Sequence, residues 1–206
     1  MPARPIIEIE TPHGLARAHL RPAEGGRGTL ALGHGAAGGV GARDLAAASR
    51  AAESRGFGVV LVEQPYRVGG RRAPAPSRQL DAAWLAVVEH LRAARLIRSP
   101  LVVGGRSSGA RVACRTADAT GAVGVVCLAF PLQPPRRAGS APAPSRLAEL
   151  DAVELPTLVV QGEHDPFGMP PGAANRSVVR VAGSHSLTTD LAAVAAAVGE
   201  WLERFR

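Results

Sequence analysis

Gly105-Arg106-Ser107-Ser108-Gly109 is the stretch that decides the fold of this 206-residue chain. An apolar run, Leu101-Val102-Val103-Gly104, precedes it, and a helix-compatible segment, 110–119, follows it. The pattern predicts a strand, a sharp turn and a helix, with Ser107 at the apex. The flanking glycines are needed because larger side chains would collide with the strand and helix backbones. Such a turn holds the serine hydroxyl at the carboxyl end of its strand, with the next backbone N–H groups pointing at whatever the serine attacks.

The motif alone leaves two interpretations open. A serine between two glycines arises by chance in a chain with 24 glycines, so an ordinary strand-to-helix turn is the alternative. The rest of the chain has to decide between them.

The composition is that of a globular protein, with 46% hydrophobic and 20% charged residues. The length fits one domain, 1–206, that buries a continuous core. All 24 basic residues are arginines, and the net charge of +7 could favour anionic partners. However, the arginines are scattered, aromatic residues make up only 3% of the chain, and no nucleic-acid-binding motif occurs. We expect no nucleic-acid partner.

The two cysteines, Cys114 and Cys127, lack metal-type spacing and are expected to be small buried residues. The absence of a disulfide framework fits a reducing cytosol. No apolar run has the length of a signal peptide or a membrane span. No cluster of histidine, cysteine and carboxylate residues suggests a metal. We therefore expect a cytoplasmic protein with no membrane partner, no metal and no cofactor.

Hydrophobic periodicity predicts alternating strands and helices after an opening hairpin. The expected strands are 6–11, 16–20, 29–32, 57–62, 101–103, 124–129, 157–160 and 177–181. The expected helices are 44–55, 77–96, the segment after the serine turn and 188–205, with a short helical turn at 147–150 and a Pro- and Arg-rich loop at 130–145. Short apolar strands between amphipathic helices indicate an α/β fold with a mostly parallel sheet, covered on both faces. In such sheets the functional site lies at the carboxyl ends of the strands.

Three of these strand ends carry residues that can act together. Ser107 follows one strand, Asp165 the next but one, and His185 the last. A serine hydroxyl is a poor nucleophile at neutral pH, so an imidazole must accept its proton during attack. A carboxylate then fixes the tautomer of the imidazole and stabilises the imidazolium. The order Ser, Asp, His predicts a catalytic triad of Ser107, His185 and Asp165.

A fourth strand end could supply the oxyanion hole. The loop His34-Gly35-Ala36-Ala37-Gly38 follows the strand 29–32. We predict that the backbone N–H groups of Ala36 and Ser108 hold the oxyanion. Such donors matter, since removing one typically costs about 3 kcal/mol of transition-state stabilisation.

Each signal also has a structural alternative. His34-Gly35 could be a plain turn, Asp165-Pro166 favours turns regardless of catalysis, and Ser186 could cap the last helix. Within the motif, Ser108 fits the nucleophile position poorly, because Arg106 stands where a small residue is needed. Asp165 is preferred over Glu163 as the acid because it follows the strand end in a Gly-x-x-Asp pattern. All four signals occur in order at strand ends, which favours catalysis.

The sequence resembles the α/β-hydrolase superfamily over nearly its whole length, and within it the small, lidless dienelactone-hydrolase-like group. Three segments are further similar to the family of the hydrolase-like domain of a regulatory subunit of the NSL histone-acetyltransferase complex and its testis-expressed relatives. They are Gly33 to Gly38, Gln64-Pro65-Tyr66 with Gly70-Arg71-Arg72, and Gly104 to Gly109. The resemblance implies an α/β-hydrolase fold without a lid domain, Ser107 as nucleophile, Asp165 as acid, His185 as base, and no cofactor. Dienelactone hydrolases carry a cysteine where this chain has Ser107, so the resemblance does not extend to their substrate.

The resulting hypothesis is a serine hydrolase that cleaves a small ester, or a thioester or amide, through an acyl-enzyme. We predict that Arg106, Tyr66 and Arg71 bind the substrate, with the arginines suited to an acidic group. The alternative for the arginines is a solvated or paired structural role. The alternative function is a non-catalytic protein-interaction module on a hydrolase scaffold. The expected partner is a small-molecule ester, and the expected assembly is a monomer or homodimer.

Overall fold

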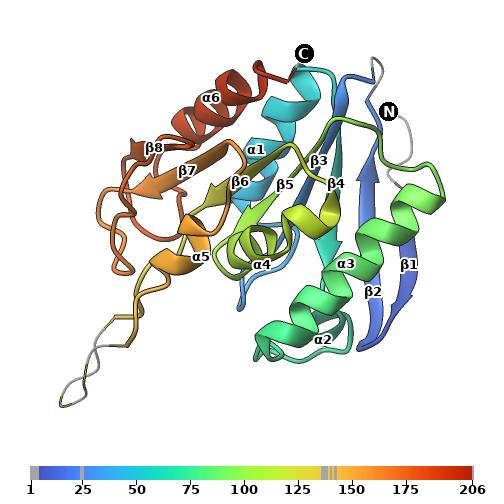
Figure 1. The fold of residues 1–206 in the computed structure, drawn as a ribbon, viewed down its shortest axis with the longest axis horizontal. Coiled ribbons are helices and arrows are strands. Elements are labelled where there is room, and N and C mark those ends of the chain that lie inside the picture. Colours follow the sequence, from blue (N-terminus) through green and yellow to red (C-terminus); the bar gives the residue numbers. More distant parts are fainter. Residues whose placement is uncertain (1–4, 24–25, 136–138, 140, 142, 206) are drawn as a thin grey trace.

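One eight-stranded sheet forms the centre of the computed structural model, which describes residues 5–23, 26–135, 139, 141 and 143–205 (Figure 1). The strands are β1 (Ile6–Thr11), β2 (Gly14–Arg21), β3 (Gly28–Gly33), β4 (Phe57–Glu63), β5 (Leu101–Arg106), β6 (Gly124–Leu128), β7 (Thr157–Gly162) and β8 (Arg176–Val181). They lie in the order β1-β2-β4-β3-β5-β6-β7-β8. The pairs β1–β2 and β2–β4 are antiparallel, and all other neighbours are parallel. The predicted mostly parallel sheet with an N-terminal antiparallel hairpin is confirmed.

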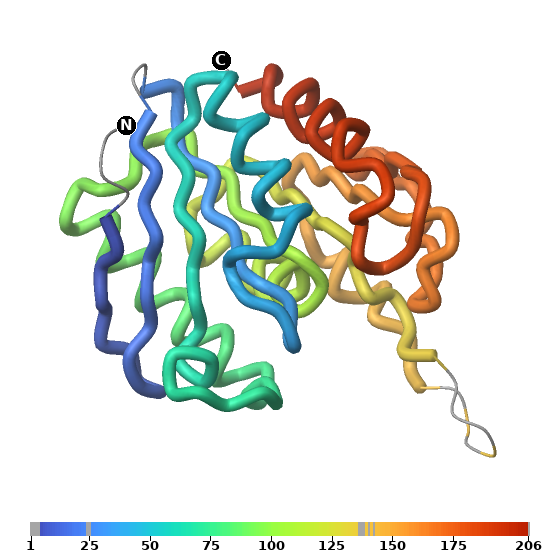
Figure 2. Tube along the Cα trace, turned by 180° about the vertical axis from the view of Figure 1, so that it is seen from behind, coloured from blue at the N-terminus to red at the C-terminus, as the bar shows by residue number. Residues whose placement is uncertain are grey.

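Helices cover both faces of this sheet. They are α1 (Arg43–Ser54), α2 (Pro65–Val68), α3 (Ser77–Ala93), α4 (Ser108–Thr116), α5 (Leu147–Asp151) and α6 (Leu191–Leu202), with a 3-10 turn η1 (Asp118–Thr120). Figure 1 shows α3, α4 and α5 in front of the sheet. Figure 2, seen from behind, shows α1 and α6 side by side on the opposite face. The sheet is therefore the middle of three layers, and each face has its own apolar core.

The central strands are apolar because both of their faces are buried. Every residue of β3, β6 and β7 is buried. On one face the largest fully buried side chain is Trp84 of α3, and on the other it is Phe57 of β4. Cys114 and Cys127 are buried free cysteines, as expected. This burial explains why the strands read as unbroken apolar runs rather than as alternating patterns.

Several element boundaries differ from the predicted ones for local reasons. Helix α6 begins at Leu191 rather than at 188, because the Asp190 side chain accepts a hydrogen bond from the Ala193 N–H and caps the helix. Helix α3 ends at Ala93 rather than at 96, and Arg95 just beyond it has a φ of 56°. The segment after β4, which is not among the expected helices, begins with α2, whose first residue is Pro65.

The parallel strands place their carboxyl ends along one edge of the sheet. The loops after β3, β5, β7 and β8 carry His34, Ser107, Asp165 and His185 respectively. The Pro-rich segment after β6 lies partly outside the described residues, but the Gln133 N–H donates to the Phe167 carbonyl at 2.9 Å. Among the described residues, no helix is both long and apolar enough to cross a membrane.

Candidate active site

Ser107 sits in a backbone conformation that few residues adopt. Its φ is 52° and its ψ is −108°, between the end of β5 and the start of α4. The Ser107 N–H donates to the carbonyl of Leu128 at the end of β6, at 2.9 Å. Residues in sparsely populated regions cost roughly 1–3 kcal/mol each and persist only where the surrounding structure holds them. The turn is therefore a strained one, held by the neighbouring strand.

The two motif glycines allow the backbones to approach closely. A Cβ on Gly105 would lie 2.6 Å from the Gly33 carbonyl oxygen, and a Cβ on Gly109 would lie even closer to the same atom. Both obstacles are backbone atoms, which cannot move aside as a flexible side chain could. The glycines are thus required by the packing of α4 against β3, as the sequence pattern predicts.

The His185 ring lies beside the Ser107 hydroxyl. Its Nε2 is 2.9 Å from the Ser107 Oγ, and its Nδ1 is 2.8 Å from the Asp165 Oδ2. His185 belongs to the loop between β8 and α6. The ring of Phe167 packs against the imidazole with 4.4 Å between ring centres. With the imidazole proton on Nδ1, facing the carboxylate, Nε2 is free to accept the proton of the serine hydroxyl.

Asp165 is held by hydrogen bonds to both of its oxygens. The Phe167 N–H donates to Oδ1 at 2.9 Å, and the Gln161 Nε2 donates to Oδ2 at 2.8 Å. The Asp165 side chain is fully buried, whereas the His185 side chain is 19% exposed. The carboxylate therefore has a fixed orientation toward the imidazole, while the imidazole stays within reach of solvent.

The residues predicted for the oxyanion hole lie next to Ser107. Ser108 is the first residue of α4, and the first N–H groups of a helix have no partner within it. The loop after β3 comes close on the other side, because a Cβ on Gly35 would be 3.7 Å from the Ser107 Cβ. The loop that carries Ala36 and the first turn of α4 thus both adjoin Ser107, and the oxyanion roles of the Ala36 and Ser108 N–H groups stay predictions.

His34 and Tyr66 fix the shape of the loop that carries Ala36. The buried His34 ring places Nδ1 2.8 Å from the Gly35 carbonyl oxygen, and its Nε2 accepts from the Gln64 N–H at 3.1 Å. Burial lowers the pKa of His34 below its ordinary value, which keeps Nε2 available as an acceptor. The Tyr66 hydroxyl donates to the Ala36 carbonyl at 2.8 Å. The loop is therefore tied to the segment after β4 at two points.

The three residues predicted to bind substrate occupy different surroundings. Tyr66 is only 4% exposed and its hydroxyl is engaged by Ala36. The Arg106 guanidinium contacts Asp44 and the His185 backbone. Arg71 is exposed and its backbone N–H donates to the Tyr66 carbonyl at 2.8 Å. Of the three, Arg71 alone has an exposed side chain, and the substrate-binding role of all three stays a prediction.

Sequence reasoning missed Gln161, Phe167 and Asp44 as parts of the site. A glutamine next to the end of the apolar strand β7 was a usable signal, because a fully buried amide must find partners. It finds the carbonyls of Phe130 and Gly168 in addition to Asp165. The positions of Phe167 and Asp44 depend on loop shape and left no comparable signal. In the described parts of the chain, no group of three or more histidine, cysteine or acidic residues could hold a metal ion.

Comparison with known proteins agrees with the fold. No curated protein matches the chain significantly. Among solved structures, the chain is similar to XC6422 from Xanthomonas campestris, an α/β serine hydrolase without a lid. The two chains share 21% identity with a TM-score of 0.74, and the match covers 99% of this chain and 96% of that one. It is also similar to Est1E from Butyrivibrio proteoclasticus, at 15% identity and a TM-score of 0.76, over 97% and 98% of the two chains.

A dienelactone hydrolase from Anabaena variabilis is a third structural neighbour, with 15% identity, a TM-score of 0.74 and 98% of both chains covered. At these identities the neighbours show a shared fold. The model of the alpha/beta hydrolase domain family matches residues 26–189, which include the whole candidate site. The chain belongs to the α/β-hydrolase domain family.

Proposed function

We propose that this protein is a serine hydrolase that cleaves a small ester, or less readily a thioester or amide, through an acyl-enzyme. The observation that carries the proposal is a pair of contacts made by the His185 ring. Its Nε2 lies 2.9 Å from Ser107 Oγ, and its Nδ1 lies 2.8 Å from Asp165 Oδ2. This spacing lets the imidazole accept the serine proton as Oγ attacks a carbonyl carbon.

The steps follow from the positions of the groups. Attack by Ser107 forms a C–O bond and a tetrahedral oxyanion, which the Ala36 and Ser108 N–H groups stabilise. As the intermediate collapses, the imidazolium of His185 gives its proton to the leaving alcohol. Water then attacks the acyl-enzyme with His185 again as base, and the acid product leaves with Ser107 restored. Asp165 stays ionised and stabilises the imidazolium.

The small substrate is supported by the connection between β6 and β7, residues 129–156, which is too short for a folded lid domain. Within its described part this connection contains one helix, α5 (Leu147–Asp151), and no lid domain. A site without a lid is open to solvent, which disfavours the enclosure of a long acyl chain. We propose Arg71 as the residue that meets an acidic group on the substrate, since its side chain is exposed and follows the carboxyl end of β4.

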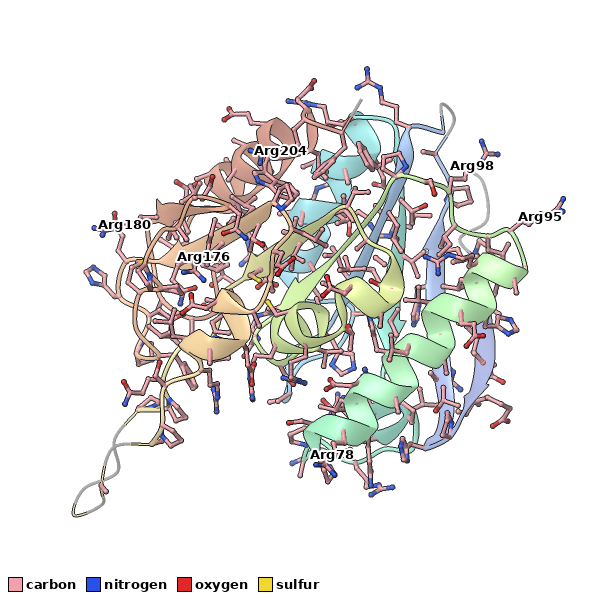
Figure 3. The ribbon with its side chains drawn as sticks, in the orientation of Figure 1. Arg78, Arg95, Arg98, Arg176, Arg180 and Arg204 are labelled. Atoms are coloured by element: carbon pink, nitrogen blue, oxygen red, sulfur yellow. The ribbon has the colours of Figure 1, made fainter. Side chains whose placement is uncertain are left out.

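Small-molecule partners are favoured over nucleic acid because the arginines labelled in Figure 3 lie on different sides of the described part of the chain. Figure 3 shows Arg95 and Arg98 near one end of the molecule, Arg78 at the far end of α3 and Arg180 on the opposite side. Others are paired with acids, among them Arg115 with Asp81. A cytosolic location, a monomeric or homodimeric state and the narrower relationship to the NSL-subunit family stay predictions.

The test is hydrolysis of para-nitrophenyl acetate by the purified protein and by Ser107→Ala. We expect turnover by the wild type and a loss of roughly 10⁴-fold or more in kcat for the variant. A matched control is Ser186→Ala, since the Ser186 hydroxyl contacts Thr188 rather than the triad. A folded wild type that turns over no ester, thioester or amide of a short-chain panel would favour the non-catalytic interaction module instead.

The Arg71 assignment has its own test. Arg71→Ala should raise KM for the anionic para-nitrophenyl hemisuccinate about tenfold and leave KM for the neutral acetate unchanged, because the loss of an arginine–carboxylate contact costs about 1–2 kcal/mol. Equal KM changes for both esters would show that Arg71 does not recognise the acidic group.

A further inference from the structure

Arg106 stands directly before Ser107, and its guanidinium contacts three separate segments of the chain. The Nε lies 2.8 Å from the Asp44 Oδ2 in the first turn of α1. The Nη2 donates to the His185 carbonyl at 3.1 Å. The Nη1 lies 2.6 Å from where a Cβ on Gly35 would be. One side chain therefore connects the nucleophile turn with the loop of the base and the loop of the predicted oxyanion donor.

Asp44 holds this guanidinium from a buried position. Its side chain is 1% exposed, and its Oδ1 accepts from the Leu45 N–H at 2.8 Å. Burial raises the pKa of Asp44, while the charge of Arg106 opposes the rise. A buried carboxylate needs a partner of opposite charge in good geometry, and a planar guanidinium has little freedom once two of its nitrogens are engaged. The pair thus fixes the direction of the guanidinium.

The contact with His185 is made to the backbone of the base. The imidazole must reach Ser107 and Asp165 at the same time, at 2.9 and 2.8 Å. His185 lies in a loop that includes two positive φ angles, 110° at Gly183 and 50° at Leu187. A donor from the carboxyl end of β5 therefore restrains the peptide from which the imidazole extends.

Gly35 leaves room for the guanidinium beside the oxyanion loop. Its φ lies outside the left-handed region, so its own backbone conformation does not demand a glycine. The nearest obstacle to a side chain at position 35 is the Arg106 Nη1. A side chain at position 35 would therefore require the guanidinium to shift.

We propose that Arg106, fixed by Asp44, is a positioning residue that holds the His185 loop and the Gly35-Ala36 loop in register with Ser107, rather than a substrate ligand. The inference rests on the proposed hydrolase function, because positioning is measured through the activity of Ser107. It replaces the substrate-binding role that the sequence predicts for Arg106. Its Nε and Nη2 already face groups within the protein.

The main test is Arg106→Lys, which keeps the positive charge but replaces the planar guanidinium and its several N–H donors with one ammonium group. We expect kcat for para-nitrophenyl acetate to fall about 10- to 100-fold with KM unchanged, because small misplacements of a catalytic group cost up to about 100-fold. The rate of Ser107 labelling by a fluorophosphonate should fall by the same factor. The same ratio is expected for the anionic hemisuccinate ester, since no substrate contact is lost.

The matched control is Arg176→Lys. Arg176 makes the same kinds of contact, with its Nε donating to the Pro171 carbonyl and its Nη2 to Asp151 Oδ1, both at 2.9 Å. It lies at the start of β8, the opposite end of that strand from the His185 loop. We expect this variant to lose stability and keep the wild-type kcat.

Asp44→Asn is the second test. Asp44 Oδ1 accepts from the Leu45 N–H, and Oδ2 lies 2.8 Å from the Arg106 Nε, so an amide would remove the negative charge that faces the guanidinium. We expect kcat to fall about 5- to 20-fold with KM unchanged, since the guanidinium loses its fixed direction. This variant decides the question if Arg106→Lys does not fold.

The outcomes separate the two proposals. If the folded wild type is neither labelled nor active, the hydrolase function fails. If the wild type is active and a folded Arg106→Lys or Asp44→Asn keeps its kcat and labelling rate, the positioning role fails. If Arg106→Lys raises KM for the anionic ester alone, Arg106 binds the substrate, as the sequence predicts.

Discussion

Tyr66 donates its phenolic O–H to the carbonyl oxygen of Ala36 over 2.8 Å, and this bond joins the segment after β4 to the predicted oxyanion loop. The sequence predicts Tyr66 as a substrate ligand, whereas the contact points to support of the loop. We expect Tyr66→Phe to lower kcat about tenfold, because the Ala36 N–H loses its fixed position, and to lower the free energy of unfolding by about 1 kcal/mol.

Steady-state kinetics and urea unfolding of Tyr66→Phe check this. An increase in KM with unchanged kcat would instead support direct contact between the Tyr66 hydroxyl and the substrate.

Asp165→Asn should lower kcat by roughly 10³- to 10⁴-fold, the range seen when the acid of such a triad becomes an amide. Both Asp165 oxygens accept from N–H donors, Phe167 on one side and Gln161 on the other. An amide NH₂ therefore meets a donor in either orientation, and in one of them it also faces His185 Nδ1. The kcat of the variant measures the effect, and a loss of less than tenfold would show that Asp165 is not the acid.

The strained backbone at Ser107 predicts that replacing this serine with glycine stabilises the fold, although it abolishes catalysis. With φ at 52° and ψ at −108°, a residue with a side chain is disfavoured there, whereas glycine is not. We expect Ser107→Gly to be inactive and about 1 kcal/mol more stable than Ser107→Ala, which is inactive as well. Urea unfolding of the two variants compares them directly. Equal stabilities would mean that the turn stores no strain.

The charge cluster between α4 and α5 predicts a pH-dependent contribution to stability. Burial alone would raise the pKa of Glu149, but hydrogen bonds and charges from Arg111 and Arg115 outweigh it and hold the pKa below its ordinary value of 4.5. A carboxylate with a lowered folded-state pKa stabilises the fold above the unfolded-state pKa and loses this effect as the pH falls through the folded value.

Glu149→Gln should therefore cost about 2 kcal/mol at pH 7, and the difference from the wild type should shrink below about pH 4.5. Urea unfolding at several pH values measures it. A difference that stays constant down to pH 3 would contradict the lowered pKa.

The sequence was sufficient for the order of the elements and for the residues at the strand ends. The central strands are recognisable because burial on both faces leaves them apolar throughout, as in β3 and β7. Ser107 and Asp165 could be named because each comes shortly after a buried apolar strand, and His185 because it follows the last strand, β8. Parallel strands bring these ends to one edge of the sheet. This logic needs no knowledge of side-chain packing.

The supporting contacts could not be derived in the same way. The Arg106–Asp44 pair joins residues far apart in a chain rich in arginine, so nothing marks that arginine as different from the exposed ones. Nothing in the sequence marks the hydrogen bond from Tyr66, within α2, to the Ala36 carbonyl. Such contacts depend on the path of loops, which hydrophobic periodicity does not specify.

The central claim is that Ser107 is an activated nucleophile. Intact-mass analysis after incubation with a fluorophosphonate, followed by peptide mapping, tests it most directly. We expect a single adduct on the wild type, located on the peptide that contains Ser107, and no adduct on a folded Ser107→Ala. An adduct that persists in Ser107→Ala, or a folded wild type that is not labelled, would contradict it.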